Sequence, residues 1–156
     1  MNVMVEIRNK ESYVQPKWGY TGGDWIVANK KIVILSNSDE SPWVTAVTNA
    51  LVSIGTTQIW DEKKTLASFK NEEIDLLLLD ASTVENDVVP LVQLLHLENE
   101  WVPIVVATTS PTWRRARKIL LAGATDYIGR SLDPETILGK CQDALEQTDA
   151  PLALWE

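Results

Sequence analysis

Short apolar runs alternate with amphipathic segments along most of the chain. Ile32–Leu35 is a run of the kind that is buried on both faces of a parallel sheet. Between Trp43 and Ile54 the apolar residues recur at spacings of three and one, which predicts a helix with one buried side. Further strands are expected at residues 57–60, 74–79, 103–107 and 125–129, and helices after Asp61, at residues 87–97 and 111–121, and after Asp133. Five such alternations predict an α/β fold, a (βα)5 three-layer sandwich around a five-stranded parallel sheet.

Residues that favour helix ends stand at several of the predicted boundaries. Gly55 follows the first helix and Gly123 follows the fourth, where a glycine C-terminal cap is expected. Asp133 precedes Pro134, a pair that favours the N-terminal cap and first position of a last helix.

The first 30 residues differ from the rest in charge and pattern. Residues 1–30 sum to +1 (four basic, three acidic) and residues 31–156 to −9 (ten basic, nineteen acidic). Val3–Arg8 ends in the alternation of a strand, and Trp25–Val27 is a second apolar run after a glycine-rich turn. We expect a β-hairpin-like N-terminal extension at 1–30, a body at 31–148 and a C-terminal tail at 149–156. A partly ordered leader is the alternative for the first segment.

Composition excludes several classes of protein. With one Cys and one His among 156 residues, the chain can form neither an intramolecular disulfide framework nor a Cys/His zinc site. The net charge of −8 disfavours direct binding to nucleic acid. Apolar runs such as Leu76–Leu79 are far shorter than the ~20 residues of a membrane helix, and the N-terminus lacks the pattern of a signal peptide. We therefore expect a cytoplasmic protein that does not bind membranes.

Polar residues follow the predicted strands. In a parallel sheet the carboxyl ends of the strands meet at one edge, where functional sites form. The residues expected there are those from Ser36 and Asn37 to Glu40, those from Asp80 to Ser82, and the pairs Thr108-Thr109 and Arg130-Ser131.

Three segments carry a more specific signal. They are Leu76–Asp80, Pro103–Thr108 and Ala122–Arg130, with 28 residues from Asp80 to Thr108 and 22 from Thr108 to Arg130. In pattern and spacing, residues 30–148 resemble a response-regulator receiver domain of the CheY-like, flavodoxin-like fold. The resemblance implies that Asp80 is equivalent to the phosphoacceptor, Thr108 to the pocket hydroxyl and Tyr127 to the switch aromatic.

Three positions depart from that family. Arg130 stands where receivers have a Lys, and its planar fork does not substitute freely for an ammonium group. Receivers place two adjacent acidic residues after the first strand to hold Mg²⁺, and Ser36 and Asn37 occupy that place here. A count backwards from Gly55 instead puts Asp39 there, which leaves Asp39 and Asp80 as possible metal ligands. We expect Asp80 and Arg130 to form an ion pair that lowers the pKa of the carboxyl.

The resemblance and its departures imply an atypical or pseudo-receiver, a regulatory signalling module that acts through protein–protein interaction. Mg²⁺-dependent aspartyl phosphorylation would be weakened or lost, and no cofactor would be needed. The alternative is a phosphorylatable receiver of two-component signalling that uses Asp80 and Mg²⁺. A flavodoxin-like nucleotide or flavin binder is disfavoured because no Gly lies between Lys31 and Gly55. A hydrolase is disfavoured because the one His, His96, lies within an apolar helix.

The predicted helix at 111–121 is basic. It carries Trp113, Arg114, Arg115, Arg117 and Lys118. In receivers the fourth helix, fifth strand and fifth helix form a common surface for dimers and output, and the fifth helix here is acidic. We expect this surface to bind a protein partner or a second copy, the alternative being an ordinary solvated helix face.

Overall fold

The computed structural model describes residues 29–38 and 40–149. Residues 1–28 of the predicted extension, Asp39 and residues 150–156 of the tail lie outside the described residues. The described chain forms β1 (Lys30–Leu35), α2 (Pro42–Leu51), β2 (Gly55–Trp60), α3 (Glu62–Ser68), β3 (Leu76–Asp80), the 3₁₀ helix η1 (Ala81–Thr83), α4 (Val88–Glu98), β4 (Ile104–Thr108), α5 (Trp113–Ala122), β5 (Asp126–Gly129) and α6 (Pro134–Asp149).

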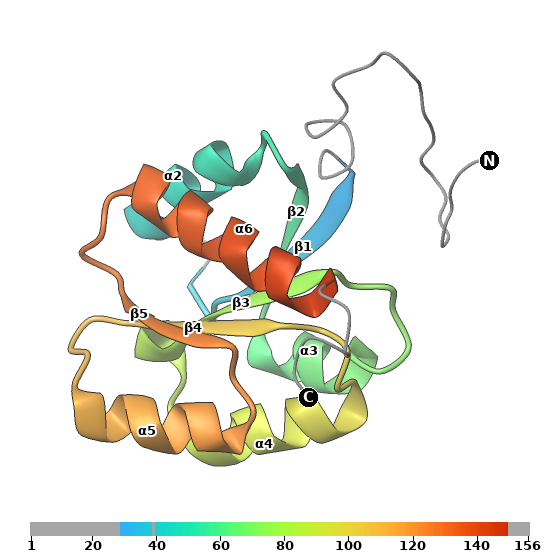
Figure 1. The fold of residues 1–156 in the computed structure, drawn as a ribbon, viewed down its shortest axis with the longest axis vertical. Coiled ribbons are helices and arrows are strands. Elements are labelled where there is room, and N and C mark those ends of the chain that lie inside the picture. Colours follow the sequence, from blue (N-terminus) through green and yellow to red (C-terminus); the bar gives the residue numbers. More distant parts are fainter. Residues whose placement is uncertain (1–28, 39, 150–156) are drawn as a thin grey trace.

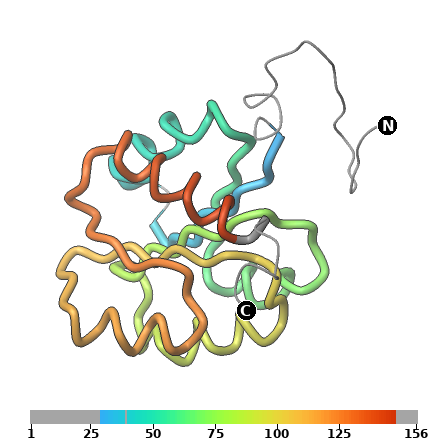
Figure 2. Tube along the Cα trace, viewed as in Figure 1, coloured from blue at the N-terminus to red at the C-terminus, as the bar shows by residue number. Residues whose placement is uncertain are grey.

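The five strands form one parallel sheet with the order β2-β1-β3-β4-β5. Helices α2 and α6 cover one face of the sheet, and α3, α4 and α5 cover the other (Figure 1). Figure 2 shows the same layers as a trace, with α4 and α5 side by side below the sheet. This confirms the predicted α/β sandwich and brings the carboxyl ends of all five strands to one edge.

The inner strands β1, β3 and β4 are largely apolar because both faces of the sheet are covered, whereas the edge strand β2 contains Thr56, Thr57 and Gln58. Ile32 and Ile34 of β1 pack in the cluster beneath α2 and α6, whereas Val33 and Leu35 pack in the cluster beneath α3, α4 and α5. Every residue of β3, including Asp80, has no solvent exposure. The central strand therefore places a carboxyl group directly at the end of the hydrophobic core.

Helix ends follow the predicted capping residues, with one exception. Asp61 caps α3 by accepting the amide of Lys64 at 2.7 Å, and Asp133 accepts the amide of Thr136 at 2.8 Å at the start of α6. Gly123 ends α5 with a φ of 124°, a conformation that favours glycine. Within the described residues, no helix is long and apolar enough to span a membrane.

The prediction that Gly55 caps the first helix was wrong. Helix α2 ends at Leu51 with Val52 as its C-terminal cap, and Gly55 is the first residue of β2. A Cβ atom on Gly55 would overlap the backbone carbonyl of Lys30 in the neighbouring strand β1. Glycine is needed here because β1 and β2 approach closely, a contact between residues distant in the sequence.

We expect Gly55→Ala to lower the free energy of unfolding by about 2 kcal/mol, because the added Cβ would force apart the start of the β1–β2 pair. Urea denaturation would measure this change. Gly139→Ala in α6 is the matched control, since a Cβ there meets no atom within 4 Å. The control should be unchanged or stabilised by up to about 1 kcal/mol. Equal losses in both variants would contradict the explanation.

Candidate functional site

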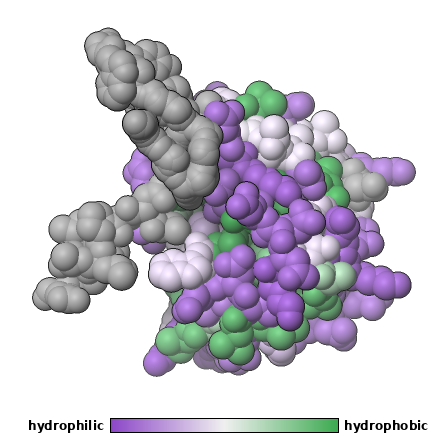
Figure 3. All heavy atoms as spheres, turned by 90° about the vertical axis from the view of Figure 1, so that its right-hand side faces the viewer, coloured by the Kyte–Doolittle hydropathy of each residue, from purple (hydrophilic) through white to green (hydrophobic). Residues whose placement is uncertain are grey.

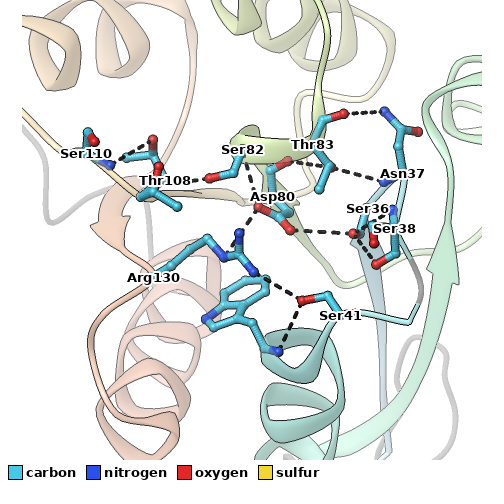
Figure 4. Close-up of polar contacts among 12 residues, drawn as sticks. Ser36, Asn37, Ser38, Ser41, Asp80, Ser82, Thr83, Thr108, Ser110 and Arg130 are labelled. Atoms are coloured by element: carbon cyan, nitrogen blue, oxygen red, sulfur yellow. Dashed lines mark hydrogen bonds and ion pairs between the residues drawn. The ribbon is translucent and has the colours of Figure 1, made fainter.

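Asp80 lies at the centre of the carboxyl edge, between residues from three other segments (Figure 4). Arg130 Nε lies 3.7 Å from Asp80 Oδ1, which also accepts the amide of Ser82 at 3.3 Å. Ser36 Oγ donates to Asp80 Oδ2 at 3.5 Å. The structure thus brings together Asp80, Ser36 and Arg130 as the strand topology predicted, and both carboxylate oxygens have partners within the chain.

The expected direction of the Asp80 pKa was wrong. Burial away from water raises the pKa of Asp80, and this effect exceeds the lowering by Arg130 and by the hydrogen bonds from Ser82 and Ser36. The ion pair itself is present, but its distance of 3.7 Å is long for a charge-assisted contact. The carboxyl at the end of β3 is therefore harder to ionise than an ordinary aspartate.

Arg130 is held from its other side by the start of α2. Its Nη2 donates to Ser41 Oγ at 3.2 Å, and its guanidinium carbon lies 4.7 Å from the centroid of the Trp43 ring. Ser41 is also the N-terminal cap of α2, because its Oγ accepts the amide of Trp43 at 3.1 Å. A cation over an aromatic face is stabilised by the quadrupole of the ring. We call Arg130, Ser41 and Trp43 the arginine clamp.

Sequence reasoning missed the clamp. It placed Trp43 in the buried stripe of the first helix, and Trp43 does pack partly against that core cluster. The Ser41-Pro42 pair is a recognisable helix start, but it does not indicate that Ser41 also binds an arginine. Only the fold brings the two segments together, since 89 residues separate Arg130 from Ser41.

Asn37 bonds to the loop after β3 and to α3, and none of its hydrogen bonds in the described chain reaches Asp80. Its amide nitrogen Nδ2 donates to the carbonyl of Thr83 at 2.9 Å, and its Oδ1 accepts the amide of Glu62 at 2.9 Å. Its backbone amide donates to Thr83 Oγ1 at 3.0 Å. Asn37 therefore ties the end of β1 to η1 and to the start of α3.

Thr108 and Tyr127 lie beside η1. Both line a cavity of about 120 Å³, with Ala81 and Arg115 among the other residues of its wall. Thr108 Oγ1 accepts the amide of Ser110 at 3.5 Å, and Tyr127 packs partly against the core under α4 and α5. Ser82 Oγ accepts the amide of Thr109 at 3.1 Å and so joins η1 to the end of β4.

The described residues do not suit Mg²⁺. They contain no group of three His, Cys, Asp or Glu side chains that could hold a metal ion. At the site they offer one carboxylate, Asp80, which is already paired with Arg130. The hydroxyl of Ser36 and the amide of Asn37 make hydrogen bonds within the chain, and Mg²⁺ in proteins is usually bound by carboxylate oxygens. Asp39, the other proposed ligand, lies outside the described residues.

The basic helix α5 lies on the surface beside α4. Arg115 Nη2 pairs with Asp87 Oδ1 at 3.3 Å, so this arginine already has a partner within the chain. Arg114, Arg117 and Lys118 are exposed, and Trp113 is 76% exposed. Leu121 of α5 and Leu97 of α4 are also exposed. Figure 3 shows a mainly hydrophilic face with hydrophobic residues gathered toward its lower end. The outer surface of α5 thus combines positive charge with apolar groups, a mixture suited to protein contacts.

Comparison with solved structures shows the fold of CheY-like response-regulator receiver domains. A receiver domain protein from Methanospirillum hungatei JF-1 matches with a TM-score of 0.68 at 21% identity, over 78% of this chain and 97% of that one. A response regulator from Thermotoga maritima matches with a TM-score of 0.66 at 20% identity, over 76% and 98%. The beryllofluoride-activated NtrC4 receiver domain dimer matches with a TM-score of 0.67 at 13% identity, over 76% and 98%. No protein-family model and no curated protein matches the chain.

The raised pKa of Asp80 predicts how stability depends on pH. Because the folded-state pKa lies above the unfolded value, the folded protein binds more protons in the pH window between the two. The contribution of this carboxyl to stability therefore falls as the pH rises through that window. We expect Asp80→Asn to be more stable than the parent protein at pH 7, with the difference vanishing below the unfolded pKa of about 4. Thermal unfolding at several pH values would measure this, and a variant that is less stable at pH 7 would contradict it.

Replacement of Arg130 in the arginine clamp should lower the stability of the folded protein. Arg130→Met leaves the buried Asp80 carboxylate without its cation and should cost about 3 kcal/mol at pH 7, with a smaller loss at pH 4. The double variant Asp80→Asn/Arg130→Met is the control, and it should recover most of the loss because no buried charge remains. Equal losses in the single and double variants would show that Arg130 acts through packing alone.

Proposed function

We propose that this chain is an atypical receiver-like signalling module that acts through protein–protein interaction, with Mg²⁺-dependent phosphorylation of Asp80 weakened or lost. The observation that carries the proposal is the pairing of the Asp80 carboxylate with Arg130, whose guanidinium is itself bound by Ser41 and Trp43. A regulatory role rather than a catalytic one follows, since the acidic group at the centre of the site is occupied by the protein's own cation.

The chemistry of phosphoryl transfer supports this proposal. Transfer to a carboxylate needs cations that neutralise charge on the transferring group and position it. A metal ion held by several acidic ligands does this, whereas the described site supplies one arginine and the neutral side chains of Ser36 and Asn37. The raised pKa of Asp80 also reduces the ionised fraction of the nucleophile near that pKa. A site of this kind would accept a phosphoryl group slowly at best.

The alternative is a receiver that still switches through phosphorylation of Asp80. The favouring observation is that Thr108 and Tyr127 line one cavity beside η1, which directly follows Asp80. In this alternative Thr108 would bind the phosphoryl group and Tyr127 would move between two positions in response. Asp39 would then have to help hold Mg²⁺ together with Asp80.

The basic helix α5 is the proposed docking surface. Arg114, Arg117 and Lys118 lie free of ion pairs within the described chain and can meet an acidic surface. One candidate arrangement is a symmetric homodimer through α5, β5 and α6, in which the exposed acids Glu135, Asp143 and Glu146 of α6 would face the basic helix of a second copy. Among the similar structures, the NtrC4 receiver domain is described as a dimer. A separate partner domain is the other candidate.

Incubation with acetyl phosphate and Mg²⁺ tests the loss of phosphorylation. We expect intact-mass spectrometry to find no phosphoryl adduct of about 80 Da, and we expect no change in Trp fluorescence when beryllofluoride is added, because Arg130 occupies the carboxylate. Asp80→Asn is the matched control and should likewise show no phosphoryl adduct and no change in Trp fluorescence. A saturable, Mg²⁺-dependent response that disappears in Asp80→Asn would instead establish the switching receiver.

Charge reversal on α5 tests the docking surface. Arg117→Glu should weaken association at least tenfold, because a repelled rather than attracted charge would face the acidic partner surface. Added salt should weaken the parent complex but strengthen that of the variant, and sedimentation velocity would measure both. Lys70→Glu, on the exposed segment after α3, is the control with the same change in net charge and should leave association unchanged. Association unaffected by Arg117→Glu would exclude α5 from the interface.

A further inference from the structure

A second surface feature lies at the same carboxyl edge as Asp80. It is a groove of about 520 Å³ between the end of β1, the start of α3 and the segment after η1. Asp61, Glu62 and Glu85 supply acidic groups to its wall, Lys63 supplies one basic group, and the partly exposed Leu66 adds an apolar surface. We call this the acidic groove.

The acidic groove is built from bonded backbone segments. Asn37 in its wall binds the carbonyl of Thr83 and the amide of Glu62, so three separate segments are joined at this point. Asp61 additionally caps α3 through the amide of Lys64. A concave surface that is already formed loses less entropy on binding than a mobile loop would, and this favours its use as a docking site.

The negative charge of the groove favours a basic partner. Three carboxylates and one ammonium group give it a local charge of −2. Among the ion pairs of the described chain, none includes Asp61, Glu62 or Glu85. Carboxylates that lack a cation in the free protein can gain one from a partner, and arginine is the cation best suited to paired contacts with them.

The outer surface of α5 has the complementary chemistry. Trp113 and Arg117 lie four residues apart on one side of the helix, and Arg114 and Leu121 extend the same exposed surface. Trp and Arg are the residues that contribute most often to binding energy when they enter a pocket on a partner. The acids of α6 lie on the convex surface of a helix, whereas the acidic groove is an open hollow of about 520 Å³ that leaves room for the Trp113 ring. The groove is therefore the better counterpart for α5.

We propose that α5 of one copy of this chain docks into the acidic groove of the next copy. This inference rests on the proposed role of α5 as a docking surface and names what that surface binds. The contact is heterologous, because two different surfaces meet, so a pair of copies keeps a free groove on one molecule and a free helix on the other. Association should then continue beyond a dimer as concentration rises, either to a closed ring or to an open chain. High salt should dissociate it, because the contact depends on exposed charges.

Two double variants test the contact by sedimentation velocity. Glu62→Lys/Glu85→Lys reverses the charge of the groove and leaves α5 intact, and Arg114→Glu/Arg117→Glu reverses α5 and leaves the groove intact. We expect the parent protein to grow in mass with concentration and each variant alone to be monomeric. Glu73→Lys/Glu100→Lys, two exposed acids outside the groove, is the control and should assemble as the parent does.

A mixture of variants then separates this contact from a symmetric dimer. The groove variant retains a native α5, and the helix variant retains a native groove. In a mixture, the two native surfaces therefore lie on different molecules. An equimolar mixture should associate although neither variant does so alone, because the native α5 of the groove variant can meet the native groove of the helix variant. In a symmetric dimer through α5, β5 and α6, the groove variant would still dimerise alone and the mixture would add no new species.

Each other result would exclude a specific contact. A parent protein that stays monomeric at all concentrations would overturn the inference. Association lost in the helix variant but retained in the groove variant would overturn the groove contact and leave α5 as the docking surface. Association retained in the helix variant would overturn both. The acetyl phosphate experiment addresses the Asp80 site and does not depend on any of these outcomes.

Discussion

A carboxylate without solvent exposure must find its compensation inside the protein, and Asp80 does so at the end of the central strand β3. Arg130 after β5 supplies the charge, while Ser36 after β1 and the amide of Ser82 in η1 supply hydrogen bonds. Burial still dominates, and the pKa of the group is raised despite the arginine. Three other segments of the carboxyl edge are thus arranged around one buried charge that is costly to keep away from water.

The position of Arg130 depends in turn on the start of α2. Ser41 binds the guanidinium and caps the helix with the same oxygen, and Trp43 stacks on the guanidinium from the first turn. On the other side, Asn37 and Ser82 join η1 to the ends of β1 and β4. The loop after Asp80 is therefore bonded to the ends of both neighbouring strands, β1 and β4.

Charge is distributed unevenly around this edge. Acidic groups line the groove beside α3, whereas the unpaired basic groups of α5 lie on the other side of α4. A protein with a net charge of −8 repels its own copies on average, so any self-association must depend on local complementarity. Separation of the two surfaces on one molecule favours contacts between copies over contacts within one copy.

The sequence by itself determined the fold and which residues lie at the carboxyl edge of the sheet. Apolar runs buried on both faces, and caps such as Asp61, Gly123 and Asp133, depend on local pattern and could be predicted. Only the tertiary structure decided the sign of the Asp80 pKa shift, the strand contact at Gly55, the bonds of Asn37 to Thr83 and the arginine clamp. These depend on burial and on contacts between distant residues, such as the 89 positions between Ser41 and Arg130, which a local pattern does not encode.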